Sequence, residues 1–372
     1  MTVKDLHREA MKFNDLALIA KQNNNVSEVK ENYLKAFEIE KQAFILFNSE
    51  SSEEPTRSVL LRSAANLAIL SEQIREAEKL ISIGLAGDPP HSIAEEFRNL
   101  LQQVNFLRHL ELHGIVLNPN ELQLSLSGNQ VGHGLIRSDE FLNRIEIIER
   151  MAFRTADRIR NKPFNDKGRP LKNNVVNFEP YLSIPRAASF AVTIRFGQSA
   201  EQQVFEGMDV QTQLIDDILK NINLINEENY EQLSQNIKDE SYRRNFIALT
   251  KKLAPDGDRI KLVGFTTTRN LDNNIVALTR INKEVQVQDL GEYSMLPISK
   301  KEIEITGTLS FADSKKSKIK LTDAKNTDYE IEVPQGLLSD IVKPYFEETV
   351  IIRGIQAGKK IELKDIEKIE YL

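Results

Sequence analysis

Apolar residues recur every three or four positions through the first 110 residues, the spacing of amphipathic helices. The first two predicted helices lie on either side of three asparagines at 23–25, and the third begins at Pro55, where a first-turn proline is tolerated. The fourth ends at Gly87 with Pro89 just beyond, and the fifth covers about 92–110. The front of the chain is therefore predicted to be all-α.

The period changes after residue 111. Leu122, Leu124 and Leu126 alternate with polar residues, which predicts a half-buried strand. A helix is predicted to start at Ser138, and further helices near 209–224 and 239–253. Strands are predicted at 189–196, 259–266 and 274–279. Strands and helices in clusters, without regular alternation, favour an α+β fold.

Alternating apolar residues dominate the last 75 positions. They predict a long strand bent at Gly307, a second strand around Ile319 and Leu321, and a third ending at Pro334. Helical spacing follows over 337–346. A fourth strand ends at Gly354, and the fifth is carried either by 361–363 or by 366–369.

Small residues at fixed positions in the front segment resemble a tetratricopeptide repeat, a 34-residue helical hairpin. Residues 58–91 match most fully, and residues 10–43 match without the closing proline. The matching positions of 58–91 are Leu61, Ala64, Ala65, Ala68, Ala77, Ile81, Gly84 and Pro89. The resemblance implies a groove that binds proteins, or an array that docks on the rest of the chain. A generic helical bundle is the alternative.

The element order of the back segment resembles the OB-fold, a five-stranded barrel with its helix between the third and fourth strands. An SH3-like barrel with an added helix is the competing interpretation. Taken together, the patterns predict a multidomain α+β protein. Its parts are a helical-repeat bundle over 1–110, a central mixed α+β domain over 111–297, and a small β-barrel with one helix over 298–372.

Composition narrows the function classes. The 372 residues include no cysteine, which excludes disulfides, thiolate nucleophiles and cysteine metal sites. The N-terminus lacks a signal-like apolar segment and no apolar run is long enough to span a bilayer, so we expect a cytoplasmic protein without a membrane partner. The net charge of −6 lacks the global basic bias of non-specific nucleic-acid binders.

Two basic stretches are candidate nucleic-acid contacts. The first follows the predicted helix after Ser138, with Phe164 as a stacking ring among its charges; the second lies on a predicted hairpin near the C-terminus, within a segment of 13 basic and 14 acidic residues. The candidate residues are Arg158, Arg160, Lys162, Lys167, Arg169, Lys172, Lys315, Lys316 and Lys318. A solvated loop and a solubilising strand edge are the simpler interpretations. Phe311 and Tyr329 are predicted to be core residues.

Glycines at 128, 132 and 134 lie between a strand and a helix, where backbone N–H groups could cradle a phosphate. The spacing of Gly128, Gly132 and Gly134 matches neither a dinucleotide-binding fingerprint nor a P-loop, so a flexible turn is the alternative. His109 and His113 have the i, i+4 spacing of a metal pair without an identifiable third ligand, and we predict no metal site.

No catalytic constellation is recognisable. The acid pairs Asp216–Asp217 and Asp256/Asp258 are predicted to be a poorly aligned helix pair and a turn. We therefore predict no catalytic residue and no cofactor. The first hypothesis is a non-enzymatic adaptor or regulatory subunit with protein partners, compatible with a bacterial defence or toxin-neutralising system. The alternatives are a nucleic-acid-associated protein using the barrel and the 158–172 loop, and a nucleotide-binding protein using the 128–134 glycines.

Overall fold

The computed structural model divides the chain into two compact units, Met1–Val116 and Leu117–Leu372. It describes residues 2–22, 25–50, 53–112, 117–129, 131–132, 135–165, 180–183, 190–197, 208–269, 272–278, 301–358 and 360–369. The domain boundaries that the sequence predicts after residues 110 and 297 stay predictions. No helix in these ranges is long and apolar enough to cross a membrane.

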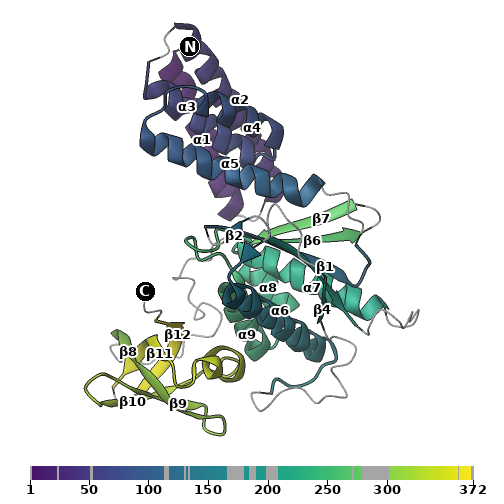
Figure 1. Cartoon of the computed structure of the whole chain (residues 1–372), viewed down its shortest axis with the longest axis vertical. Coiled ribbons are helices and arrows are strands. Elements are labelled where there is room, and N and C mark those ends of the chain that lie inside the picture. Colours follow the sequence, from purple (N-terminus) through teal and green to yellow (C-terminus); the bar gives the residue numbers. More distant parts are fainter. Residues whose placement is uncertain are drawn as a thin grey trace. The chain divides into compact units, whose positions relative to one another are not determined.

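The first unit, here called the helical unit, is all-α in its described residues, as predicted (Figure 1). Each helix packs on the next along the chain, and the third also packs on the fifth. The helices are α1 Val3–Gln22, α2 Val26–Glu50, α3 Thr56–Leu70, α4 Ile74–Leu85 and α5 His91–Leu112.

Small residues let these helices approach closely. Ala64 and Ala65 on α3 and Ala77 on α4 are 0% exposed and belong to one cluster of buried apolar side chains. A Cβ atom added at Gly84 would lie 2.3 Å from the ring of Phe97, which is itself 0% exposed. Glycine is therefore required at position 84 by the packing of α5 on α4.

The front of the second unit, here called the α/β block, is a five-stranded antiparallel sheet in the order β4–β5–β1–β6–β7. Its strands are β1 Glu121–Ser127, β4 Pro180–Leu182, β5 Phe190–Phe196, β6 Leu262–Arg269 and β7 Asp272–Leu278. A small hairpin follows β1, made of β2 Val131–Gly132 and β3 Leu135–Ile136. The helices are α6 Ser138–Ile159, α7 Met208–Asn226, α8 Tyr230–Asn236 and α9 Glu240–Leu253.

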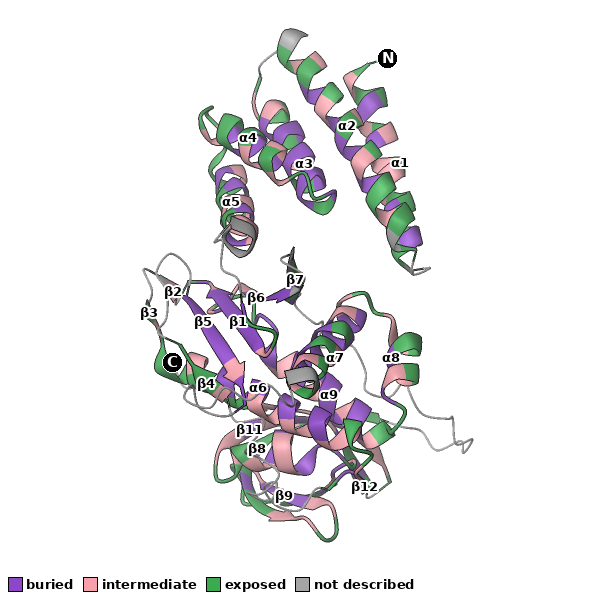
Figure 2. Cartoon of the chain, turned by 90° about the vertical axis from the view of Figure 1, so that its right-hand side faces the viewer, coloured by how far each residue is buried: buried purple, intermediate pink, exposed green. Residues whose placement is uncertain are grey.

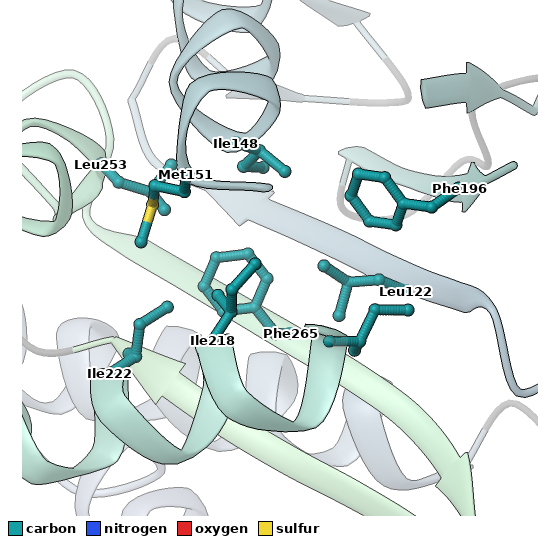
Figure 3. Close-up of a pocket in the computed structure, with 9 residues that line it drawn as sticks. Leu122, Ile148, Met151, Phe196, Ile218, Ile222, Leu253 and Phe265 are labelled. Carbon is teal, nitrogen blue, oxygen red and sulfur yellow. The ribbon is translucent and has the colours of Figure 1, made fainter. Parts of the chain in front are cut away.

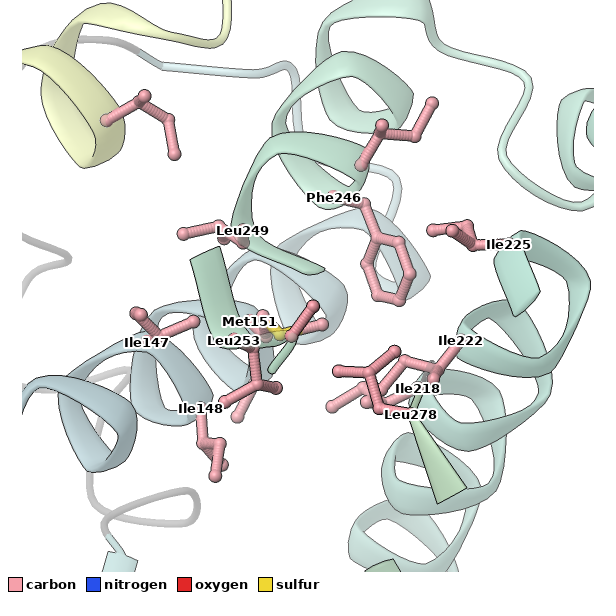
Figure 4. Close-up of a cluster of buried hydrophobic side chains, with 14 of the residues drawn as sticks. Ile147, Ile148, Met151, Ile218, Ile222, Ile225, Phe246, Leu249, Leu253 and Leu278 are labelled. Carbon is pink, nitrogen blue, oxygen red and sulfur yellow. The ribbon is translucent and has the colours of Figure 1, made fainter. Parts of the chain in front are cut away.

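Helices of the block cover one face of this sheet. Leu124 on β1 stands between Val192 on β5 and Phe265 on β6, so alternate residues of three strands build one apolar surface. Figure 4 shows the side chains of α6, α7, α9 and β7 that meet there. A cavity of about 10 Å³ remains among them (Figure 3), enough for about one water molecule. This cavity is too small to hold a substrate.

The opposite face of the sheet is polar but also buried. Gln123 and Ser125 are 3% and 0% exposed, and Thr193 and Thr266 flank Gln123 on the neighbouring strands. The expectation that 122–126 is half-buried is therefore wrong, because β1 is the central strand and its polar side chains are enclosed as well. Figure 2 shows β1 and β5 as largely buried strands.

One edge of the sheet is β7, which follows β6 in the strand order. Asn226, the last residue of α7, donates its side-chain amide to the carbonyl of Ala277 in β7, at 2.9 Å. A helix side chain thus occupies one of the main-chain acceptors on this strand.

The end of the second unit, here called the C-terminal sheet, has five strands in the order β10–β12–β11–β8–β9. The first strand of this order, β10, also pairs with the last, β9. The strands are β8 Lys301–Asp313, β9 Lys318–Thr322, β10 Asp328–Glu332, β11 Thr349–Ala357 and β12 Lys360–Lys368. Of the two candidate positions for the fifth strand, 361–363 lies in β12, and 366–369 lies in it except for its last residue.

Helical spacing over 337–346 produces a shorter structure than predicted. A π-helical turn, η2 Leu338–Val342, continues into a 3₁₀ turn, η3 Lys343–Tyr345. In an α-helix the carbonyl of Asp340 would accept from the N–H of residue 344, which is a proline and has none. An ordinary helix is therefore interrupted here.

Replacing Gly84 by alanine is expected to destabilise the helical unit by about 1–3 kcal/mol, because the new methyl group displaces the Phe97 ring. Amide hydrogen exchange of α4 and α5 in the full chain measures this loss. Gly87→Ala is the matched control, since its Cβ would meet the guanidinium end of a long Arg57 side chain and otherwise makes an ordinary 3.4 Å contact with the Gly84 carbonyl. Equal protection in Gly84→Ala and the unmodified chain would contradict the packing argument.

Candidate interaction surfaces

The C-terminal half of α1 exposes apolar side chains. Leu16, Leu18 and Ile19 are 45%, 46% and 52% exposed, while Ala17 and Ala20 between and beside them are buried against the helical unit. An open depression of about 400 Å³ lies along this helix, lined by Asp5, Arg8, Glu9, Lys12, Phe13 and Leu16. The outer flank of α1 thus combines charges of both signs with an apolar end.

Other helices of the helical unit also leave apolar side chains exposed. These are Ile45, Val59, Leu70 and Ile83. Polar contacts between helices hold the unit together elsewhere: Arg108 donates to both carboxylate oxygens of Glu78, at 2.6 and 2.5 Å. The hydrogen bond from Lys41 lowers the pKa of the Glu76 carboxyl to about 2, with a further contribution from Lys79.

The outer surface of β8 and β9 carries an exposed aromatic residue. The strands change register between Leu309 and Phe311, so that Phe311 pairs with Lys320 and its side chain is 50% exposed. The prediction of Phe311 as a core residue is wrong, because the bulge breaks the alternation on which it rests. Tyr329 is half-buried, with its hydroxyl 3.3 Å from Asp323.

The lysines near this aromatic residue divide into two groups. Lys315 and Lys316 lie in the β8–β9 hairpin, and their main-chain N–H groups donate to the carboxylate of Asp313 at 2.8 and 3.2 Å. These bonds, that from Lys315 first, hold the pKa of Asp313 below its usual value. Lys318, in β9, lies 3.7 Å from Glu330 and 3.9 Å from Glu332 on β10. The charge of this strand lysine is therefore matched by acids opposite.

The described part of the first basic stretch is committed to contacts within the protein. Arg158 donates to Asp217 on α7, and Lys162 to Asp157 at 2.8 Å. Burial raises the pKa of Asp217, although Arg158 acts in the opposite direction. Arg160 is exposed at the end of α6. Lys167, Arg169 and Lys172 lie outside the described residues, so the stretch as a nucleic-acid site stays a prediction.

Phe164, the proposed stacking ring of this stretch, is 8% exposed. Its ring packs between the guanidinium of Arg154, at 4.3 Å, and the ring of Tyr242, at 4.9 Å. The aromatic side chain is therefore used inside the α/β block.

Gly128 is explained by close packing. A Cβ atom there would lie 2.2 Å from the carbonyl oxygen of Arg259, against which the end of β1 rests. Gly132 lies in β2, and Gly134 falls outside the described residues. A phosphate cradle at the three glycines stays a prediction, whereas the need for glycine at 128 has a structural reason.

The structure describes the Asp256/Asp258 pair but not both members of the histidine pair. The carboxylate of Asp256 accepts from the N–H groups of Asp258, Arg259 and Ile260, which is the predicted turn. His113 falls outside the described residues, as does the side chain of His109. Within the described ranges, no group of three or more His, Asp or Glu side chains is placed to hold a metal ion.

A polar joint between the α/β block and the C-terminal sheet was not predicted. Here the joint means the contacts of α6 and α9 with residues 335–345 and 365. Arg150 on α6 donates to the Asp340 carbonyl at 2.6 Å, the acceptor left open by Pro344. Asn245 on α9 donates to the Gly336 carbonyl at 2.7 Å, and Arg244 to the Gln335 carbonyl at 3.0 Å.

Side-chain charges complete the joint. The Asp340 carboxylate accepts from Arg154 at 2.6 Å and from Asn245 at 3.0 Å. Both members of the Arg154–Asp340 pair are largely buried, with side chains 15% and 12% exposed. The only signal in the sequence is a set of arginines spaced by four on one helix, Arg150, Arg154 and Arg158, and such spacing is common on solvated helices.

No family model, curated protein or solved structure matches the chain.

Asp340→Asn is expected to destabilise the joint by about 3 kcal/mol, because the Arg154 guanidinium stays buried without its counter-charge. Hydrogen exchange of the amides in α9 and η2 measures the opening free energy. Glu304→Gln is the control, since the Glu304 side chain is 57% exposed and its pair with Arg353 should contribute less than about 1 kcal/mol. Similar effects of the two substitutions would show that burial does not set the strength of the Arg154–Asp340 pair.

Proposed function

We propose that the protein is a non-enzymatic interaction adaptor whose helical unit binds a protein partner through the outer flank of α1. The carrying observation is the exposure of Leu16 and Ile19, which lie one helical turn apart on α1. Exposed apolar surface bordered by charges is typical of protein-binding sites. The occupant that suits such a flank is an amphipathic segment of another protein, with an apolar face for Leu16 and Ile19 and charges for the neighbouring Arg8, Glu9 and Lys12.

Two finer fold assignments support this proposal. We take α3 and α4 to be tetratricopeptide-like, since the small residues at the repeat positions are buried where the pair closes, and Gly84 admits Phe97 from the following helix. We take the C-terminal sheet to be OB-like, because its first three strands are consecutive neighbours, β12 lies between β10 and β11, and the helical turn precedes β11. Both folds commonly act as binding modules.

A second candidate is single-stranded nucleic-acid binding by the C-terminal sheet. Phe311 favours it, as a half-exposed ring beside the hairpin that carries Lys315 and Lys316. The acids opposite Lys318 and Lys320 work against it, because they cancel the positive charge that would attract phosphate. The adaptor is therefore ranked first.

The double substitution Leu16→Asp and Ile19→Asp is expected to abolish partner capture while leaving the fold intact, since both side chains are about half exposed. The full chain would be purified from its host with nuclease treatment, and any protein recovered would be produced separately and its binding measured by calorimetry. Leu142→Asp, on α6 and 60% exposed, is the matched control. Undiminished affinity of the double variant for the identified partner would refute the α1 site.

For the second candidate, Phe311→Ala is expected to weaken binding of a labelled oligothymidylate by about 1–3 kcal/mol, the loss of one stacked base. Fluorescence anisotropy over a salt series measures it, and the affinity should fall steeply as salt rises. Tyr181→Ala, an exposed ring on β4, is the control. No binding by the unmodified chain at low salt removes this candidate.

A further inference from the structure

Lys252 on α9 lies inside the joint. Its Nζ atom donates to the carbonyl of Ile341 at 3.1 Å and to the hydroxyl of Tyr345 at 2.8 Å, and it lies 3.9 Å from the centre of the Tyr345 ring. All three contacts are to the helical turns η2 and η3 of the C-terminal sheet. The amine therefore connects the two parts of the second unit through uncharged groups.

The charged groups around Lys252 come from each element that packs there. On α6, Arg150 pairs with Glu146; on α9, Lys251 pairs with Asp365 at 2.9 Å. On β11 and β12, Arg353 lies 3.4 Å from Asp365 and 3.2 Å from Glu367. On η2, Asp340 pairs with Arg154.

Asp365, the carboxylate whose charge acts on Lys252, is thus paired with two other cations, Lys251 and Arg353. Among the described residues, none makes an ion pair with the Lys252 amine. A buried cation without a paired anion is expensive, and a lysine in this position lowers the cost by releasing its proton.

The electrostatics of the site agree with this geometry. Burial, against the opposing effect of Asp365 and with the help of the Arg150 and Lys251 charges, lowers the pKa of Lys252 to about 7. Burial, together with Asp365 and Glu367, raises the pKa of Tyr345 to about 12. The Tyr345 hydroxyl therefore keeps its proton across the physiological range and can donate to the neutral amine, reversing the bond that it accepts from the ammonium.

We propose that Lys252 acts as a proton-dependent clasp, so that the C-terminal sheet is held more firmly to the α/β block when the lysine is neutral. In the open joint, a solvated lysine stays protonated to about pH 10.5, whereas the closed joint releases that proton near pH 7. Between these values the open form binds more protons, so raising the pH favours the closed form. Below pH 7 both forms are protonated and the preference is constant.

The test is amide hydrogen exchange of η2 and β10 in the full chain from pH 6 to pH 9.5, corrected for the intrinsic rate. Protection is expected to be flat below pH 7 and to rise above it by up to tenfold per pH unit. Lys252→Met should remove the rise, and Lys252→Arg, which stays charged, should remove it too. Lys220→Met is the control and should keep it, since Lys220 is an exposed lysine on α7 that does not act on Lys252.

A direct titration distinguishes the clasp from a general effect of pH. Carbon-13 NMR of the lysine side chains, with Lys252 assigned by its loss in Lys252→Arg, should show one amine titrating near pH 7. A Lys252 resonance that titrates above pH 9, or the same exchange profile in the unmodified chain and in Lys252→Arg, would overturn the proposal. The NMR result stands even where Lys252→Met fails to fold.

Discussion

One hydrogen-bond acceptor, the carbonyl of Asp340, links the two parts of the second unit. Pro344 deprives it of the donor that a continuing helix would supply, and Arg150 of α6 provides the replacement. Neighbouring carbonyls accept hydrogen bonds from the side chains of Arg244, Asn245 and Lys252 on α9. The helical turn between β10 and β11 is therefore completed by another part of the chain. The geometry of this turn depends on its packing against α6 and α9, because its own backbone supplies no donors for these carbonyls.

The sequence predicts local structure well where one period persists. The helices α6 and α9 and the strand β5 match their predicted ranges closely, because each presents one uniform face to a single core. The fifth strand of the C-terminal sheet was ambiguous for a physical reason. Its register against β11 shifts after Arg353, so the apolar alternation changes phase within β12, and each half of the strand looks like a separate element. A bulge in β8 likewise explains why Phe311 is exposed although the alternation predicts a core residue.

The candidate surfaces were less accessible to prediction. Arg158 and Lys162 look like a basic patch in the sequence, but their counter-charges, Asp217 and Asp157, lie on α7 and on the preceding turn of α6. The joint depends on pairs such as Arg154 and Asp340, which are distant in sequence and leave no periodic signature. Polar complementarity of this kind becomes visible only when the fold brings the partners together. The sequence pattern also did not separate the exposed Leu16 and Ile19 from Ala17 and Ala20, which are buried on the same helix.

The hydrogen bond from the Asn226 side chain to the Ala277 carbonyl affects how the edge of the sheet can pair with other chains. A seven-residue edge strand containing Ile275, Val276 and Leu278 offers a template on which a second chain could add a strand and begin to aggregate. By occupying one acceptor in that row, the last residue of α7 spoils the register that an added strand would need. A helix terminus thus protects the margin of the sheet, a task often left to lysine or proline on the strand itself.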